Sequence, residues 1–475
     1  MRSVIAQPGA ATRPGPSLAK PLNARTALML EAPVLPLLAR LAWPNVLIML
    51  AQASTGLIET WWIAKLGTDA LAGMALVFPA VMLMTTISAG ALGGGISSAV
   101  ARALGADRRE DADALVLHAI AINLVLGLAF SAIFLLFGRS IYGFLGGSGG
   151  ELEAALLYSN TVFAGNLFLW LMNGLASVIR GTGNMAFPAA VICIGAALLI
   201  PISPLLIFGF GPIPAFGVAG GGLALVLYYI AGTAALAWHI VSGRNAVSLR
   251  LGALRPAQLV AILRVGALSA LQSIQTNVII AGATALVAAH AGVQAVAGFG
   301  TGVRLEYLLI PLIFGIGAPM VAMVGTNIGA GYRDRALHIA MAGAGMAFVV
   351  TEAIGLAAAL FPEVWLRLFS DDATMIATGS AYLRIVGPFY GFFGLGLALY
   401  FASQGAGQLM WPLVAGCLRL LIALGGGWLA LKLTGSLVAF FAMLALALAV
   451  YGSAVYWAVR RGLWFHASEK RPLPA

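Results

Sequence analysis

Charged residues are scarce in this sequence of 475 residues: they make up 9% of it, whereas hydrophobic residues make up 61%. Soluble globular proteins carry roughly 25% charged and about 45–50% apolar residues. With so few charges, lipid must be the solvent for most of the chain, and the backbone must form its hydrogen bonds within helices or a closed barrel. A barrel needs alternating segments of about 10 residues, whereas the apolar runs here are long and unbroken. The sequence therefore predicts an all-α membrane protein.

Residues that bind metals or catalyse reactions are also few. The two cysteines, Cys193 and Cys417, lie in apolar runs, which excludes a disulfide framework or a cysteine metal cluster. The five histidines include no pair spaced by four residues, so there is no zinc signal. No phosphate-binding GK[ST] motif, Ser-His-Asp set or carboxylate dyad at helical spacing is present. We therefore expect neither an enzyme nor a cofactor.

Twelve apolar stretches are long enough to cross a bilayer, which takes about 20 residues each. They are 41–65, 70–100, 113–137, 153–179, 186–209, 217–241, 258–287, 295–325, 337–361, 376–402, 410–431 and 436–459. Most of the 26 Lys and Arg residues fall on the side of the two termini; the opposite loops hold Lys65, Arg139, Arg367 and Lys432. Since positive charge stays in the cytoplasm, we expect a bacterial inner-membrane protein with both termini cytoplasmic. The net charge of +10 reflects this topology and predicts no nucleic-acid partner.

A shift of 224 residues aligns the two halves of the chain. Residues 104–106 (LGA) lie over 328–330 (IGA), and 180–184 (RGTGN) over 404–408 (QGAGQ). The same register pairs Arg40 with Arg264, Tyr158 with Tyr382, Pro188 with Pro412, and Cys193 with Cys417. Because each half holds six spans, the repeats are parallel, a plan that places a central site between two lobes. The predicted units are a disordered cytoplasmic lead (1–32), an N-lobe (33–241), a cytoplasmic linker (242–257), a C-lobe (258–460) and a cytoplasmic tail (461–475).

Several segments resemble the multidrug and toxic compound extrusion (MATE) family. They are GLIETWWIAKLGTDALAG at 56–73, the loops LGADRREDA and IGAGYRDRA, the RGTGN turn, and PLLIFGFGPIPAFGVAGG between the fifth and sixth spans. The resemblance covers roughly residues 33–460. It implies twelve helices in two pseudo-symmetric six-helix lobes that form a V. It also implies export of organic, often cationic, compounds in exchange for protons or sodium ions.

The wider superfamily includes flippases for lipid-linked precursors, which are the alternative function. A flippase for an anionic lipid should show a row of arginines facing the cavity, and the spans contain Arg304, Arg384 and Arg419. We expect small organic cations and membrane lipid as partners, and a monomeric transporter.

Three glutamates within spans are candidates for cation coupling, because a charge inside the bilayer is costly and usually marks function. Glu59 takes the place of an aspartate that is typical of the family's N-lobe cavity; the alternative is a solvated residue near Lys65 at the end of its helix. Glu306 could instead form a structural pair with Arg384 or Arg419. Glu352 lies in the middle of its span and either faces the cavity or packs between helices.

The chain departs from the family at other ion-binding positions. Relatives with an N-lobe site often have Asn and Asp four residues apart before PLLIFG, where this chain has Leu199 and Ser203. Other relatives carry acids in the seventh and tenth spans, and neither span has one here. Because a hard cation takes several oxygen ligands, the departure favours H⁺ over Na⁺ as the coupling ion.

The predicted substrate cavity combines aromatic and methionine side chains with a few polar groups. Methionine is adaptable and aromatic faces attract cations, which favours amphipathic organic cations as substrates. The alternative for each residue is packing against lipid or neighbouring helices, as for two asparagines spaced seven apart. The candidates are Trp61, Trp62, Met74, Phe78, Asn166, Asn173, Ser203, Gln275, Asn277, Tyr307 and Tyr390.

Overall fold

The computed structural model describes residues 24–466, which are almost entirely helical. The long helices of the first half are α2 (Val34–Ala64), α3 (Thr68–Thr85) with α4 (Gly93–Gly105), α5 (Arg109–Phe144), α6 (Gly149–Ala164), α7 (Asn166–Gly181), α8 (Ala186–Phe208) and α9 (Val218–Val241). Those of the second half are α10 (Pro256–Gly329), α11 (Arg333–Leu360), α13 (Ala373–Val386), α14 (Tyr390–Ala406), α15 (Met410–Leu420), α16 (Gly427–Thr434) and α17 (Leu437–Arg460). Short helices are α1 (Ala24–Glu31), α12 (Pro362–Leu366) and α18 (Leu463–His466).

Helix α10 contains two membrane crossings. A straight helix of its 74 residues would be about 110 Å long, far more than the roughly 30 Å of a hydrocarbon core. Gly292 breaks it at φ 78° and ψ −173°, a conformation that glycine adopts without steric cost. In the first half, α6 and α7 together make one crossing that bends by 48°. Within the described residues each half thus supplies six crossings, which confirms the predicted all-α fold of twelve membrane-spanning helices in two lobes.

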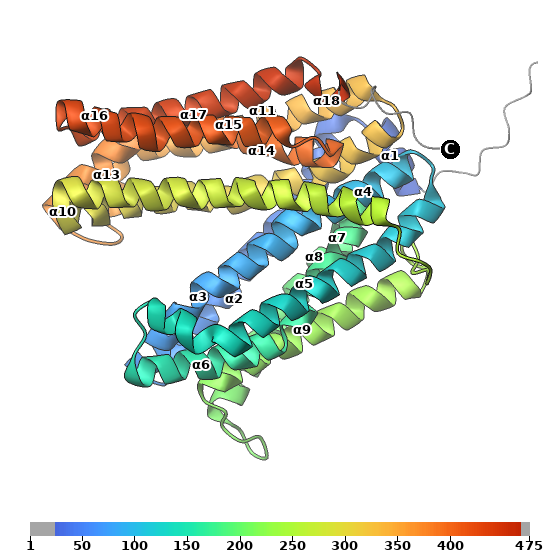
Figure 1. The fold of residues 1–475 in the computed structure, drawn as a ribbon, viewed down its shortest axis with the longest axis horizontal. Coiled ribbons are helices and arrows are strands. Elements are labelled where there is room, and N and C mark those ends of the chain that lie inside the picture. The colour runs from blue at the N-terminus through green and yellow to red at the C-terminus, as the bar shows by residue number, and fades with distance from the viewer. Residues whose placement is uncertain (1–23, 467–475) are drawn as a thin grey trace, which may run out of the picture.

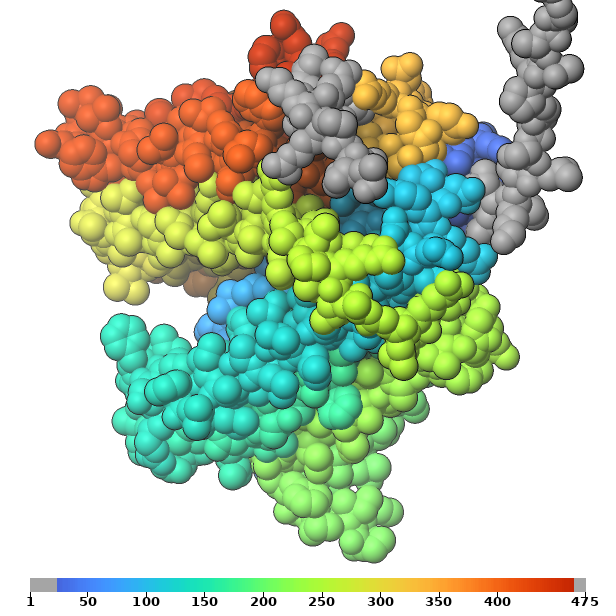
Figure 2. Space-filling model, turned by 45° about the vertical axis from the view of Figure 1, so that its right-hand side comes forward, coloured from blue at the N-terminus to red at the C-terminus, as the bar shows by residue number. Residues whose placement is uncertain are grey.

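The two halves form the arms of a V (Figure 1). The N-lobe, α2–α9, runs from blue to green, and the C-lobe, α10–α17, from yellow to red. The arms meet near α1, α4 and α18 and separate toward α6 and α16, so both described ends of the chain lie at the closed end. The space-filling view shows the hollow between the separated arms (Figure 2).

Each lobe has its own apolar core, and the first helix of each lobe reaches into the other. Leu38, near the start of α2, packs into the C-lobe core, and Ile262, near the start of α10, packs into the N-lobe core. These two residues are 224 positions apart, so they are equivalents in the repeat. The lobes are therefore joined at the closed end by a reciprocal exchange of helix ends.

Glycines bring the lobes into backbone contact at this end. A Cβ atom added at Gly105 would collide with the Thr326 carbonyl oxygen, and one at Gly329 would collide with the Arg102 carbonyl oxygen. The two contacts are related by the same shift of 224 residues. Small residues allow such close approach between membrane helices, which explains why the LGA and IGA segments match across the repeat.

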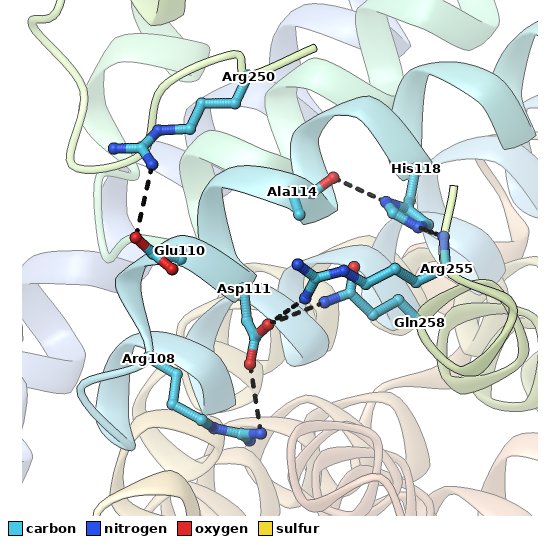
Figure 3. A network of polar contacts seen from close by, with 8 residues as sticks. All are labelled: Arg108, Glu110, Asp111, Ala114, His118, Arg250, Arg255 and Gln258. Atoms are coloured by element: carbon cyan, nitrogen blue, oxygen red, sulfur yellow. Dashed lines mark hydrogen bonds and ion pairs between the residues drawn. The ribbon is translucent and has the colours of Figure 1, made fainter. Parts of the chain in front are cut away.

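The segment between the lobes is fastened to α5 (Figure 3). The Asp113 carboxylate accepts the backbone N–H of Ser248 at 2.8 Å and lies 3.1 Å from Nε of Arg250. His118 Nε2 accepts the backbone N–H of Arg255 at 2.7 Å, while its Nδ1 faces a carbonyl one turn earlier, which requires the neutral ring with hydrogen on Nδ1. The linker therefore packs as part of the N-lobe surface.

Two predicted boundaries need correction. The disordered lead was expected to extend over 1–32, but residues 24–31 form α1, which packs against α10; residues 1–23 lie outside the described residues. Arg335 donates to the Ala32 carbonyl oxygen at 2.5 Å and helps hold this segment. The linker was expected to end at 257, whereas α10 begins at Pro256, because proline suits the first position of a helix.

Candidate functional site

Glu59 is buried inside the N-lobe, with 4% of its surface exposed. It projects from α2 toward α6 and α9, and the Tyr158 hydroxyl donates to its Oε1 at 3.1 Å. At Gly221 of α9 an added Cβ would lie only 3.2 Å from the same oxygen, so the glycine leaves room for the carboxylate. Among the described residues no basic side chain lies within 4 Å of the Glu59 carboxylate. The alternative of a solvated residue at the helix end is wrong.

Lys65 does not neutralise Glu59, because its ammonium group is engaged elsewhere. Its Nζ lies 3.6 Å from the ring centroid of Trp61 and 4.7 Å from that of Trp62. The two tryptophan rings meet edge to face with centroids 4.5 Å apart. A cation over an aromatic face is attracted by the ring quadrupole, so this aromatic pair already accommodates one positive charge.

Glu306 is buried in the C-lobe as half of an ion pair. Arg419 of α15 donates to its Oε1 at 2.9 Å, and Tyr382 of α13 donates to its Oε2 at 3.0 Å. Both partners of the ion pair are buried, Glu306 with 7% and Arg419 with 4% of its surface exposed. Of the two alternatives for Glu306, the structure favours the structural pair, with Arg419 rather than Arg384 as the partner.

Glu352 binds the backbone where a 3₁₀ turn separates α13 from α14. Its Oε2 accepts the N–H of Gly391 at 2.7 Å, in the first turn of α14 just after the 3₁₀ turn Gly387–Phe389. A carboxylate at this place satisfies an N–H that has no partner within its own helix, as an N-terminal cap does. Glu352 is half-buried between α11 and α14, so it packs between helices.

Several predicted cavity residues are buried within a lobe and do not line an open cavity, which corrects the prediction. Asn166 donates to the Gly127 carbonyl oxygen at 3.0 Å, and Asn173 donates to Ser88 Oγ at 2.8 Å, so both asparagines tie helices together. The physical reason is that an amide in lipid must find a protein partner. The buried members of the set are Met74, Asn166, Asn173, Ser203 and Tyr390.

The other predicted cavity residues have solvent- or lipid-accessible surface. Tyr307 and Asn277 belong to α10, and the Asn277 amide donates to a carbonyl of its own helix. Gln275 is half-buried and contacts the sulfur of Cys417 at 3.0 Å. The accessible members are Trp61, Trp62, Phe78, Gln275, Asn277 and Tyr307. They come from both lobes.

Arg180 is a residue that sequence reasoning missed. It was assigned to a cytoplasmic loop, but it lies in the last turn of α7 and is only 6% exposed. It lines a cavity at the junction of the lobes, together with Gln404 of α14. The two residues are equivalents in the repeat, and this match of RGTGN with QGAGQ was the signal that could have revealed it.

Comparison with known proteins identifies relatives along most of the chain. The MatE family model matches residues 44–205 and 269–429. A protein of Shewanella oneidensis described as "FAD transporter" is 26% identical over 79% of this chain and 82% of its own length. The "Probable multidrug resistance protein NorM" of Thermotoga maritima is 25% identical over 79% of this chain and 81% of its own length.

Solved structures share the fold. A MATE crystal structure in the bent conformation superposes with a TM-score of 0.87 at 24% identity, covering 95% of this chain and all of that one. A multidrug resistance MATE transporter of the MOP superfamily in an outward-facing conformation superposes with a TM-score of 0.84 at 23% identity, with the same coverage. At this identity the likeness concerns the fold alone.

Proposed function

The chain belongs to the MatE family, and from that premise we propose that it exports amphipathic organic cations by antiport, with protons as the coupling ions and Glu59 as the coupling residue. Members of this family are secondary transporters, so the chain is a multi-pass membrane transporter and not an enzyme. The coupling ion, the substrate class and the role of Glu59 are our proposal.

The observation that carries the proposal is the isolation of Glu59. Glu306 is neutralised by Arg419, and Glu352 is bound to a backbone N–H, whereas Glu59 has only the Tyr158 hydroxyl as a hydrogen-bond partner within the described residues. A buried carboxyl without a counter-charge is the group whose protonation changes most when water gains access to it. Alternate exposure of Glu59 to the two sides of the membrane would therefore couple proton movement to the motion of the lobes.

Protons suit this site better than sodium ions. Sodium, like other hard cations, takes several oxygen ligands, whereas one hydroxyl accompanies the Glu59 carboxylate. Leu199, at a position where relatives often carry a polar ligand, offers no oxygen from its side chain. A single proton needs only the carboxylate itself.

Organic cations remain the expected substrates, and flavin nucleotides are a second class to be tested. The accessible aromatic side chain of Phe78 suits flat apolar cations. The relative described as an FAD transporter covers most of this chain, which makes FAD itself the most direct second substrate to assay.

We further propose that the protein lies in a bacterial inner membrane with both termini in the cytoplasm. This orientation follows from the excess of Lys and Arg in the loops on the side of the termini. The closed end of the V then faces the cytoplasm, and the hollow between the arms opens outward (Figure 2). Exchange of one proton for one monovalent organic cation moves no net charge, so the pH gradient drives it: one pH unit supplies about 1.4 kcal/mol, enough for a tenfold concentration gradient of the cation.

Proteoliposomes that contain the purified protein test this proposal. Ethidium transport is followed by fluorescence under an imposed pH gradient or an imposed sodium gradient, and FAD transport is followed in parallel. The variants are Glu59→Gln and, as a matched control, Glu352→Gln, which keeps an oxygen to accept the Gly391 N–H. We expect transport under the pH gradient alone, loss of at least 90% of it in Glu59→Gln, and wild-type rates in Glu352→Gln.

Each part of the proposal can fail separately. Equal transport by Glu59→Gln and wild type would remove Glu59 from the coupling step. Transport driven by a sodium gradient alone would show that sodium, and not the proton, is the coupling ion. Transport of FAD but not of ethidium would show that the substrates are flavin nucleotides and not organic cations.

A further inference from the structure

A small cavity lies between the lobes at the closed end of the V. Its walls come from α4, the π-helical turn Thr86–Leu92 before it and α7 of the N-lobe, and from α10 and α14 of the C-lobe, so it exists only while the lobes meet here. Its volume is about 20 Å³, enough for one water-sized group. We call it the junction cavity and define it by Ser97, Ser177, Arg180, Phe314, Phe401 and Gln404.

The polar wall of the junction cavity carries an uncompensated positive charge. Within the part of the chain that the structure describes, Arg180 makes one hydrogen bond, from its Nη2 to Ser177 Oγ at 3.0 Å, and no carboxylate lies within 4 Å of its guanidinium. Ser97, on the facing α4, is also buried, and its hydroxyl has no hydrogen-bond partner among residues 24–466. Buried arginines are normally paired, because a lone charge loses its hydration without recovering it elsewhere.

Close packing keeps other protein groups out of this space. A Cβ at Gly93 would lie 2.6 Å from Ser177 Oγ, and a Cβ at Gly94 would collide with the Gln404 amide. The Gln404 amide donates to Ser269 Oγ at 2.8 Å and to the Gly90 carbonyl oxygen at 3.3 Å, so it is held in place. The glycines of α4 thus bring these side chains close together, yet the guanidinium is left without an anion.

The positive charge of Arg180 is present in the N-lobe only, because the equivalent residue of the C-lobe is Gln404. Arg180 and Gln404 occupy equivalent positions, and both line the junction cavity. Packing at this position therefore accepts a neutral amide in one lobe, so the positive charge in the other is not needed to fill the volume. A donor-rich, cationic wall with a free hydroxyl fits an anionic ligand.

We propose that the junction cavity binds a small anionic group, with the Arg180 guanidinium as its counter-charge and the Ser97 hydroxyl as a second donor. The group is either a free monovalent anion such as chloride or formate, or the carboxylate of a larger molecule whose body extends between the lobes. Because both lobes form the cavity, the anion holds them together at this end and favours the conformation seen here over one in which this end is open.

Thermal unfolding of the purified full-length protein in detergent measures binding without any transport step. Sodium chloride, formate and benzoate are titrated at constant ionic strength against the sodium salt of a bulky morpholine sulfonate buffer, whose anion is larger than the cavity of about 20 Å³ and carries no carboxylate. The central variant is Arg180→Gln, which installs the residue that the repeat already accommodates at 404. The matched controls are Arg180→Lys, which keeps the charge, and Arg384→Gln, which removes an exposed arginine from the other lobe.

We expect the unfolding temperature of the wild type to rise with the concentration of the small anions until it saturates. Relative to the wild type, the anions should bind at least tenfold more weakly to Arg180→Gln and severalfold more weakly to Ser97→Ala. Arg384→Gln should bind them as the wild type does. Arg180→Lys should retain part of the effect. Stabilisation by chloride and formate but not benzoate identifies a free anion, whereas benzoate binding at least as strongly as formate identifies a carboxylate of a larger molecule.

The proposal is overturned if no anion gives a saturable effect on wild type, or if Arg180→Gln responds as wild type does. A Glu59→Gln protein that still binds the anion separates this site from the coupling proposal, since the two sites lie in different parts of the N-lobe.

Discussion

Equivalent tyrosines in the two lobes hydrogen-bond to buried glutamates, but only the glutamate of the C-lobe has a basic partner among the described residues. Tyr158 in the N-lobe and Tyr382 in the C-lobe are repeat equivalents, and each donates a hydrogen bond to a buried glutamate. The glutamates come from different crossings, Glu59 from the first and Glu306 from the eighth. Arg419 neutralises Glu306, whereas Glu59 has no basic partner within the described residues. Duplication thus preserved the hydroxyl donor while the acids and their counter-charge diverged.

The difference bears on the proposed coupling. The paired and hydrogen-bonded Glu306 carboxylate ties α10, α13 and α15 together. An unpaired one can change its charge when its exposure to water changes. On the proposed coupling through Glu59, the N-lobe is the arm that responds to protons.

The largest expected effect comes from breaking the C-lobe pair. Arg419→Met leaves the Glu306 charge buried without compensation and should lower the free energy of unfolding by about 3–5 kcal/mol, measured by denaturant or thermal unfolding in detergent. The double variant Arg419→Met with Glu306→Gln should recover most of the loss, because it removes both charges. A single variant as stable as the wild type would show that water already solvates Glu306.

A smaller effect distinguishes the two acids directly. Glu306→Gln strands the Arg419 charge and should destabilise the C-lobe by more than about 2 kcal/mol. Glu59→Gln strands no charge and keeps an oxygen for the Tyr158 hydroxyl, so it should change stability by less than about 1 kcal/mol. The same two unfolding measurements provide the test, and equal losses would contradict the asymmetry of the lobes.

Sequence reasoning could predict the fold because its signals are long and periodic. The sequence alone shows twelve apolar stretches, an excess of Lys and Arg in the loops on the side of the termini, and a repeat at an offset of 224 residues. The partner of Glu306 could be narrowed only to Arg384 or Arg419, because the choice depends on how α13 and α15 rotate in the C-lobe. The burial of Arg180 was missed for a related reason: hydropathy marks where a span ends but not whether the other lobe covers that end.

The site residues were predicted unevenly. Glu59 stood out as an acid inside an apolar run, and its burial matches that signal. Asn166 and Asn173 gave the same polar signal, yet they bind neighbouring helices. Polarity within a span shows that a side chain needs a partner, but only packing shows whether the partner is a ligand or another helix.

Removing the tyrosine hydroxyl in each lobe tests the contribution of a single hydrogen bond to each glutamate. Tyr158→Phe and Tyr382→Phe each remove a donor to a buried carboxylate, and each should lower stability by about 1–2 kcal/mol. Only Tyr158→Phe should change the rate of ethidium transport under a pH gradient, because only Glu59 lies on the proposed coupling path. A transport defect in Tyr382→Phe that exceeds its loss of stability would bring the C-lobe acid into the mechanism.

The smallest effect is expected at Glu352, which lies in the C-lobe and takes part in neither the Glu306–Arg419 pair nor the Glu59–Tyr158 hydrogen bond. Glu352→Gln keeps an oxygen within reach of the Gly391 N–H and should change stability by less than about 0.5 kcal/mol, whereas Glu352→Ala removes the cap and should cost about 1 kcal/mol. Unfolding of the two variants side by side separates the hydrogen bond from the charge. If Gln proves as costly as Ala, the negative charge at the start of α14 matters in its own right, since the helix dipole favours an anion there. Glu352 would then resemble Glu306 as an acid whose replacement by Gln is costly, and the contrast with Glu59 would extend to both of the other candidate glutamates within the membrane spans.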